Sequence, residues 1–284
     1  MKKFLIVAAI VAVFGGSSIA FIASRGKPTP TITAPTKSYV ALGDSIAAGV
    51  GLKDDSDSSA CNRTNQAYPN VVASQLNYKL HSVACSGATY LNGILGSQNV
   101  NELQVQPQID QLFAGAKPNL ITLTAGANDA GWTTLFGKCY SGSCGSEADK
   151  AGITASMQNL KLNVQASLAR IQADYGSAAP PVVVTGYHQV FPATVPANCS
   201  DLAGFDAGEL AWARSLQPLI NETISAEVAA YPFAHFAAVD FSGHELCTAD
   251  PWVQGLTSPQ PYHPTADGQA AFAKAVIQAT KEAQ

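Results

Sequence analysis

The stretch "KSYVALGDSIAAGVG", residues 37–51, decides the prediction of the fold. Its YVAL segment is apolar and predicts a short buried strand, which ends at Gly43-Asp44-Ser45 and is followed by small residues. The serine at this place has two interpretations. It can N-cap the following helix, as serine often does, or it can present its hydroxyl as a nucleophile at a strand end. The choice depends on partner residues elsewhere in the chain.

Short apolar segments alternate with segments of helical periodicity along the rest of the chain. We expect strands at residues 38–42, 81–84, 119–124, 182–185 and 235–239. Apolar residues recur at helical spacing in 157–175 and 207–230, and Thr265 resembles the N-cap of a last helix. Such alternation is typical of a parallel sheet covered by helices on both faces. In open sheets of this kind, sites form beyond the carboxyl ends of the strands.

The N-terminus has the pattern of an export signal. Lys2 and Lys3 precede a run without charged residues from Phe4 to Ala23. A basic start followed by an apolar run is typical of a signal peptide, and about twenty apolar residues are also enough to span a bilayer. We therefore predict that residues 1–25 form either a signal peptide or an N-terminal membrane anchor. The sequence leaves both alternatives open, and the anchor would imply membrane association through residues 4–23.

A linker and one domain follow this segment. Residues 26–37 are rich in Pro and Thr, a composition that does not bury a core. The predicted folded domain covers residues 38–284. Both alternatives for the N-terminus place this domain outside the cytoplasm, either secreted or on the outer face of the cytoplasmic membrane.

Charge and composition limit the partners of this domain. The formal net charge of the 284 residues is −4, and the acidic residues lie beyond the basic N-terminal segment. An acidic domain without a basic run argues against nucleic acid as a partner. We expect a monomer that acts on a small-molecule or lipid substrate.

The six cysteines also fit an exported protein. An even number in an oxidising compartment predicts three disulfides. Six cysteines allow fifteen pairings, and spacing alone does not choose among them, although Cys139 and Cys144 lie close enough to form a small loop. The chain has no Cys-x-x-Cys pair and no closely spaced His pair, so we expect no metal site.

Small and polar residues follow two further predicted strands. Gly87 comes after strand 81–84, and Asn128 comes after strand 119–124 within Gly-Ala-Asn-Asp. His263 lies just before the last predicted helix. Each block by itself is equally typical of an ordinary turn.

Taken together, the Gly-Asp-Ser block, Gly87, Asn128 and His263 resemble the SGNH (GDSL-type) hydrolase family. The four residues that give this family its name occur in the family's order, and the resemblance covers essentially residues 38–284. The Gly-x-Ser-x-Gly elbow of the other common serine-hydrolase architecture is absent from the sequence. The resemblance implies a flavodoxin-like three-layer α/β/α sandwich, with no cofactor and no metal.

The resemblance also implies a role for each residue. Ser45 would attack an ester carbonyl, and His263 would accept its proton and return it to the departing alcohol. The backbone N–H groups of Ser45 and Gly87 and the side-chain amide of Asn128 would form the oxyanion hole.

The chain departs from the family pattern at one position. The family usually has an Asp three residues before the His, where this chain has Gln260. Some actinobacterial-type members use a backbone carbonyl there, so we predict that the Gln260 carbonyl orients His263. A carboxylate of Asp250 or Glu245 is the alternative. These relatives also imply the disulfides Cys61–Cys85, Cys139–Cys144 and Cys199–Cys247.

The predicted function is that of an extracytoplasmic serine ester hydrolase, an esterase or lipase that cleaves acyl esters. A carbohydrate O-deacetylase would use the same four residues. A non-catalytic lipid- or glycan-binding protein is a further alternative, suggested by Gln260. We expect His188 as a residue that lines the substrate cleft, together with a set of apolar residues near the site: Leu52, Trp132, Phe136, Phe191 and Trp252.

Overall fold

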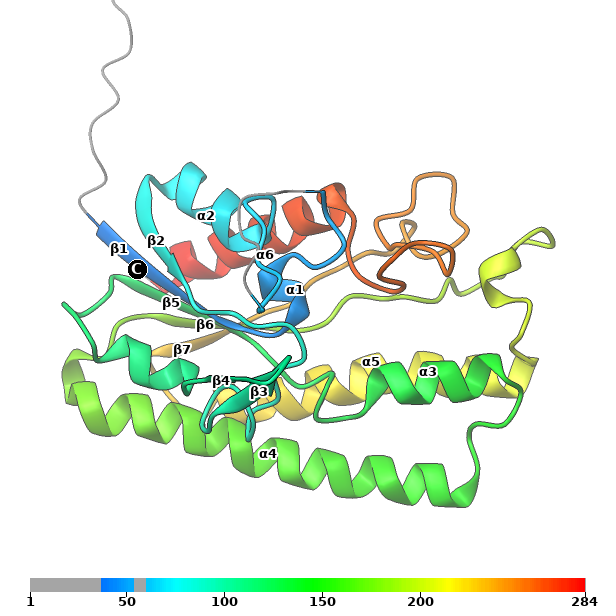
Figure 1. The fold of residues 1–284 in the computed structure, drawn as a ribbon, viewed down its shortest axis with the longest axis horizontal. Helices are drawn as coiled ribbons and strands as arrows, with labels where there is room; N and C mark the ends of the chain where they lie inside the picture. Colours follow the sequence, from blue (N-terminus) through cyan, green and yellow to red (C-terminus); the bar gives the residue numbers. More distant parts are fainter. Residues whose placement is uncertain (1–36, 54–59, 284) are drawn as a thin grey trace, which may run out of the picture. The chain divides into compact units, whose positions relative to one another are not determined.

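The computed structural model describes residues 37–53 and 60–283, and the predicted N-terminal signal or anchor lies outside these residues. Five parallel strands form the main sheet in the order β2-β1-β5-β6-β7 (Figure 1). The strands are β1 (Lys37–Gly43), β2 (Tyr78–Ser82), β5 (Leu120–Thr124), β6 (Val182–Thr185) and β7 (Ala234–Ala237).

The strand order places a topological switch point beside β1. From β1 the chain first adds β2 on one side, and it then adds β5, β6 and β7 on the other side. This is the flavodoxin-like order, in which ligands bind outside the carboxyl ends of the strands at the reversal. In the register of the pair, Gly43 at the end of β1 lies opposite Thr124 at the end of β5. The segments after these two strands therefore begin side by side.

Helices cover both faces of the sheet. Helices α2 and α6 lie on one face, and α4 and α5 lie on the other (Figure 1). The helices are α1 (Ser45–Ala48), α2 (Tyr68–Leu76), α3 (Trp132–Tyr140), α4 (Glu147–Tyr175), α5 (Ala207–Val228) and α6 (Ala266–Glu282). The parallel sheet covered on both faces, predicted from the alternating pattern, and the three-layer α/β/α sandwich that the resemblance implies are confirmed.

The inner strands β5 and β6 are buried along their whole length because both faces of the sheet are covered. All residues of β5 and β6 are buried, as expected for parallel strands between two helical layers. The edge strand β2 instead alternates between half-buried and exposed residues. Its pairing begins at Tyr78, three residues before the predicted start at residue 81, because an edge strand needs no continuous apolar run.

Local sequence signals explain where the long helices begin. Ser146 and Asp149 form a capping box at the start of α4, and Asp206 and Glu209 form another at the start of α5. Helix α4 therefore starts ten residues before the periodic segment 157–175 that predicted it. The hydroxyl of Thr265 accepts a hydrogen bond from the Gly268 N–H, which confirms its predicted role as N-cap of α6.

Smaller elements complete the described part of the chain. Strands β3 (Gln98–Val100) and β4 (Leu103–Val105) form an antiparallel hairpin that the sequence did not predict. Three 3-10 helices are η1 (Gln108–Leu112), η2 (Gly176–Ala178) and η3 (Ser200–Leu202). The disulfides are Cys61–Cys85, Cys139–Cys144 and Cys199–Cys247, the pairing that the family resemblance implies. Within residues 37–53 and 60–283, no helix is both long and apolar enough to cross a membrane.

Candidate active site

The turn after β1 is fixed by its neighbours on the sheet. Gly43 has a φ of 150°, and a Cβ at this position would lie 2.6 Å from the Thr124 carbonyl oxygen, so only glycine fits. The buried side chain of Gln108 accepts from the Gly43 N–H at 2.7 Å and donates to the Gly43 carbonyl at 2.9 Å. The Asp44 N–H donates to the Thr124 carbonyl at 2.9 Å. These contacts present the next residue, Ser45, at the end of the strand.

Asp44, and not Ser45, caps the short helix α1. Its Oδ1 accepts from the Ile46 N–H at 2.9 Å, and its Oδ2 accepts from the Tyr187 hydroxyl at 2.6 Å. The capping interpretation of Ser45 is therefore wrong. Because aspartate caps helices as well as serine does, the same three-residue block is able to cap the helix and still leave the serine hydroxyl available.

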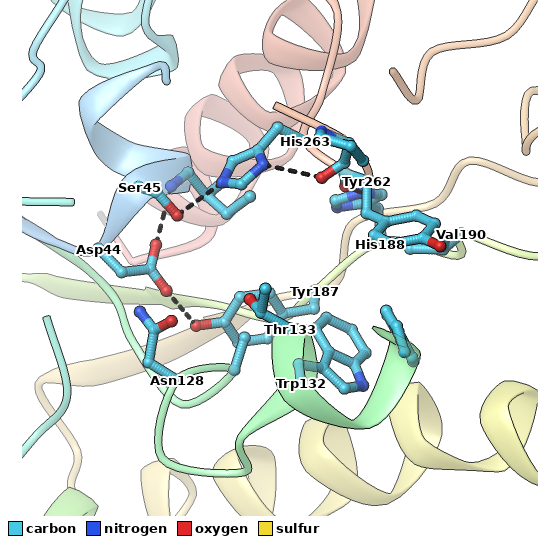
Figure 2. A pocket seen from close by; sticks show the side chains of 14 residues that line it. Asp44, Ser45, Asn128, Trp132, Thr133, Tyr187, His188, Val190, Tyr262 and His263 are labelled. Atoms are coloured by element: carbon cyan, nitrogen blue, oxygen red, sulfur yellow. Dashed lines mark hydrogen bonds between the residues drawn. The ribbon is translucent and has the colours of Figure 1, made fainter. Parts of the chain in front are cut away.

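The histidine lies on a turn that folds back against its own preceding segment. The Gln254 N–H donates to the His263 carbonyl at 2.8 Å, and the Tyr262 N–H donates to the Gln254 carbonyl at 2.9 Å. This pairing brings the imidazole of His263 over the turn after β1. Its Nε2 lies 2.8 Å from the Ser45 Oγ (Figure 2), although 218 residues separate the two in the sequence.

The hydrogen bond of the imidazole Nδ1 goes to the Pro261 carbonyl, one residue beyond the predicted carbonyl of Gln260. The His263 Nδ1 lies 3.1 Å from the Pro261 carbonyl oxygen. The Gln260 carbonyl instead closes the turn by accepting from the His263 backbone N–H at 3.4 Å. Pro261 is thus the main carbonyl partner of the ring, and the Gln260 carbonyl acts on the pKa of His263 in the same direction.

The two alternative carboxylates have other partners. Glu245 accepts a hydrogen bond from the Gly243 N–H at 2.8 Å. Asp250 lies beside His244, with its Oδ2 3.4 Å from the His244 Nδ1. A backbone carbonyl therefore stands where the family pattern has an aspartate, and it supplies a dipole where the carboxylate would supply a charge.

The environment of His263 favours its neutral form. Burial lowers the pKa of His263 from its usual value of 6.5, and hydrogen bonds to the carbonyls of Pro261 and Gln260 act in the opposite direction. The Pro261 carbonyl can only accept, so Nδ1 carries the proton and Nε2 presents a lone pair toward Ser45. A neutral imidazole in this tautomer is able to take the hydroxyl proton.

Asn128 lies on the loop after β5, and Gly87 lies on the loop after β2. Asn128 lines the same pocket as Ser45 and His263. Its Nδ2 donates one hydrogen to the Ala88 carbonyl at 2.9 Å, and an amide nitrogen carries a second hydrogen. Gly87 has a φ of 79°, and the side chain of its neighbour Cys85 is tied to Cys61. The structure thus brings the loops that carry all four sequence-predicted residues to one end of the sheet.

A small cavity of about 50 Å³ opens beside Ser45 and His263. Trp132, Phe136 and His188 line it as predicted, and so do several residues that the sequence did not indicate: Ile46, Ala127, Thr133, Tyr187, Val190, Pro261 and Tyr262. Leu52 and Trp252 are not among its lining residues. Phe191 lies behind it, with its ring packed edge-on at 4.9 Å from that of Phe136.

Two carboxyl groups with raised pKa values were not predicted, the buried Asp44 in the cavity wall and the half-buried Asp129 on the loop after β5. Burial raises the pKa of Asp44 to about 7, against the hydrogen bonds from Tyr187 and Ile46. Burial also raises the pKa of Asp129 to about 6, and both of its oxygens accept from the Tyr90 N–H. The sequence shows an aspartate in the Gly-Asp-Ser block and another in the Gly-Ala-Asn-Asp block. It does not show their surroundings, because the tyrosine partner of Asp44 lies 143 residues away in the chain.

Within the described residues, no group of three or more His, Cys, Asp or Glu side chains forms a potential metal site. A strand-end serine bonded to a histidine, in a parallel α/β sandwich, is the arrangement of a serine-type hydrolase.

The chain belongs to the GDSL-like lipase/acylhydrolase family, whose pattern matches residues 41–271. It is 32% identical over 258 residues to a lipase of Streptomyces rimosus, and the match covers 88% of each chain. The crystal structure of an extracellular lipase from Streptomyces rimosus superposes with a TM-score of 0.62 at 27% identity, and covers 86% of this chain and 99% of that one. A phospholipase A1 from Streptomyces albidoflavus gives the same TM-score and coverage at 26% identity. The protein is a carboxylic ester hydrolase.

Proposed function

We propose that this protein is an extracytoplasmic serine esterase or lipase in which Ser45 is the nucleophile and His263 the general base. The observation that carries the proposal is the 2.8 Å contact between the Ser45 Oγ and the His263 Nε2 at the switch point of the sheet. A serine hydroxyl is a poor nucleophile until a base takes its proton, and this contact provides the base.

The proton follows a short path. As the Ser45 Oγ attacks the ester carbonyl carbon, its proton passes to the His263 Nε2. The imidazolium then donates this proton to the departing alcohol, which leaves an acyl-enzyme. Water then attacks the acyl-enzyme. His263 takes the proton of the water and gives it to the departing Ser45 Oγ, so it again acts first as base and then as acid.

The Pro261 carbonyl holds the required tautomer throughout these steps. It accepts the Nδ1 proton at 3.1 Å, so the lone pair stays on Nε2. It carries no full charge, and it therefore stabilises the imidazolium less than an aspartate would. Because a backbone group does this work, we expect Gln260→Ala to keep kcat within about threefold of the wild type. A loss as large as that of His263→Ala would contradict the role of the carbonyl.

The oxyanion that forms in each step would be held by three donors. These are the backbone N–H groups of Ser45 and Gly87 and the second Nδ2 hydrogen of Asn128. Asn128 is a neutral donor whose first hydrogen is anchored on the Ala88 carbonyl at 2.9 Å. Donors fixed before the reaction stabilise the developing charge without a reorganisation cost.

Apolar acyl esters suit the cavity better than acetylated carbohydrate. Trp132, Phe136, Val190 and Tyr262 are among the residues that line the cavity, and apolar walls favour an acyl chain. This lining supports the esterase proposal over the O-deacetylase alternative. The intact hydroxyl–imidazole pair argues against a non-catalytic binding protein.

Three disulfides and the similarity to an extracellular lipase support a location outside the cytoplasm. Mass spectrometry of the N-terminus of the protein from its native host would distinguish a cleaved signal peptide from a retained anchor, the two alternatives for residues 1–25. Either result fits an extracytoplasmic enzyme, and a cytoplasmic pool with reduced cysteines would contradict it.

The proposal is tested with Ser45→Ala and His263→Ala on chromogenic esters of graded acyl length. Each variant should lose at least about a thousandfold in kcat. Ser143→Ala and His81→Ala are matched controls, because both side chains are exposed and lie outside the cavity. Turnover that persists in Ser45→Ala would refute the assignment of the nucleophile, and hydrolysis of acetyl esters only would favour the deacetylase.

A further inference from the structure

A second, larger cavity lies directly behind the catalytic one. The catalytic cavity has a volume of about 50 Å³, and the second has a volume of about 220 Å³. Trp132, Phe136 and Val190 line both cavities. These three side chains therefore form a partition between two spaces. Trp132 and Val190 lie across the pocket from Ser45 (Figure 2).

The catalytic cavity is small for a lipid chain. One water-sized group needs roughly 10–15 Å³ of such volume, so the cavity holds roughly three to five groups of that size. This is the room for an acetyl to butyryl chain. A longer chain that follows the same direction would reach the partition.

The second cavity is suited to hydrocarbon. Besides the partition, its apolar lining includes Phe191, Ala193, Ala213 and Pro218. Its polar side chains make hydrogen bonds to other parts of the chain, and among their atoms the Arg214 Nε is buried without a partner. Gln189 bonds Asp240, Gln217 donates to the Tyr187 carbonyl, Glu245 accepts from the Gly243 N–H, and Arg214 donates to the Pro192 carbonyl.

The three members of the partition differ in how firmly they are held. The rings of Trp132 and Phe136 lie 5.2 Å apart, and Phe136 also packs edge-on against Tyr262 and Phe191. Val190 is a single β-branched side chain, 3% exposed, on a backbone fixed by the Leu246 N–H that donates to its carbonyl at 3.0 Å. Val190 is therefore the member that can be shortened with the least disturbance of the others.

We propose that Val190, together with Trp132 and Phe136, limits the acyl chain to short lengths. The cavity behind this partition is the space that a longer acyl chain enters once the partition is opened. The proposal rests on the proposed function, because it assigns the acyl group of the substrate to the cavity beside Ser45. It makes Val190 a specificity-determining residue and not a catalytic one.

The test measures kcat/KM of the full chain on p-nitrophenyl esters with acyl chains of two to ten carbons. The kcat/KM of the wild type should fall steeply for acyl chains longer than about four carbons. In Val190→Ala, the ratio of kcat/KM for longer chains to that for acetate should rise by about fourfold for each added methylene that enters the second cavity. Val190→Ile should lower the same ratio for butyrate, because it fills the catalytic cavity.

Two further variants separate opening of the partition from general loosening. Val72→Ala removes the same two methyl groups from a fully buried valine on α2, which lines neither cavity, and should leave the chain-length profile unchanged. Ala213→Leu fills the second cavity from α5, and in the Val190→Ala background it should restore the wild-type profile.

The results distinguish the two levels of the proposal. A Val190→Ala profile identical to that of the wild type, with acetate hydrolysis still abolished by Ser45→Ala, would overturn the partition and leave the proposed function intact. The same holds if Ala213→Leu fails to reverse the change. Absence of Ser45-dependent hydrolysis of every ester in the wild type would overturn the proposed function itself.

Discussion

His188 donates a hydrogen bond from its Nε2 to the carbonyl oxygen of Tyr262, at 3.2 Å. His188 follows β6 and is 1% exposed, whereas Tyr262 directly precedes the proposed base His263 in the sequence. Burial lowers the pKa of His188 to about 3, so the imidazole is neutral, and the proton on Nε2 is fixed by a carbonyl that can only accept. A buried histidine thus bonds to the turn that carries the proposed general base.

The first prediction concerns this hydrogen bond. His188→Phe keeps an aromatic ring against Phe241, whose centroid lies 4.4 Å away, but it removes the donor to Tyr262. We expect kcat to fall roughly fivefold with little change in KM, because one hydrogen bond contributes about 1 kcal/mol. His188→Gln places an amide N–H near the same point and should recover part of the loss. Equal kcat values for the Phe and Gln variants would show that His188 only fills space.

The second prediction concerns the pH dependence of the reaction. Burial lowers the pKa of His263 below 6.5, and only the neutral imidazole accepts the Ser45 proton. Therefore kcat/KM for a neutral ester should be level near pH 7–8 and should fall as pH drops through an apparent pKa below 6.5. A pH–rate profile checks this. An acidic limb centred at pH 7 or above would contradict it.

The third prediction concerns stability and Asp44. Its folded-state pKa is about 7, against about 3.9 for an unfolded aspartate. Between these values the folded carboxyl keeps a proton that the unfolded one has lost, so its contribution to stability is complete below about pH 4 and is lost as pH rises through about 7. The slope from one such group reaches about 1.4 kcal/mol per pH unit. Urea unfolding at several pH values should show a flatter dependence for Asp44→Asn than for the wild type.

Asp129 remains in this variant and shifts in the same direction, with a pKa of about 6. Part of the slope should therefore persist in Asp44→Asn and disappear in the double variant with Asp129→Asn. The free energy of unfolding of the wild type should therefore rise less from pH 4 to pH 7 than that of the double variant. A larger rise in the wild type would contradict the raised pKa values of these two carboxyls.

The fourth prediction concerns the proposed oxyanion hole. Asn128→Ala removes a side-chain donor and should lower kcat by about a hundred- to a thousandfold while KM changes little. Steady-state kinetics on a short-chain ester measure both constants. Thr133→Ala is a suitable control, because Thr133 lines the same cavity without an expected role in charge stabilisation. Losses of equal size in both variants would point to a general disturbance of the pocket.

The fifth prediction concerns the disulfides. The Cys61–Cys85 bridge closes a separation of 24 residues, and the loop it anchors is held by the Ser86 N–H, which donates to the Cys61 carbonyl at 3.1 Å. The double variant to alanine should lose about 3 kcal/mol of stability and also lose kcat, since Gly87 lies two residues beyond the bridge. The same change at Cys139–Cys144, with a separation of 5, should cost less stability and leave kcat unchanged. Thermal melts and kinetics on both variants make the comparison.

Much of the site follows from local signals. Because Ser45 and Asn128 follow strand ends, they lie at the carboxyl end of a parallel sheet whatever the details of packing. Thr265 marks the helix that begins after His263. The starts of α4 and β2 were missed because a capping box and an edge strand depend on polar residues and pairing partners, which apolar periodicity does not reveal. The strands β3 and β4 of the hairpin have three residues each, too few to show an alternation of apolar and polar residues.

The sequence by itself determined the types of the site residues, their order along the chain and the end of the sheet at which they lie. Only the tertiary structure decided that Asp44 caps α1, that the Pro261 carbonyl reaches the imidazole, and that a partition separates two cavities. The reason is physical. Which carbonyl faces His263 depends on a turn with Tyr262 at a φ of 68°, and that turn is held by His188, 74 residues away in sequence, so no local pattern encodes it.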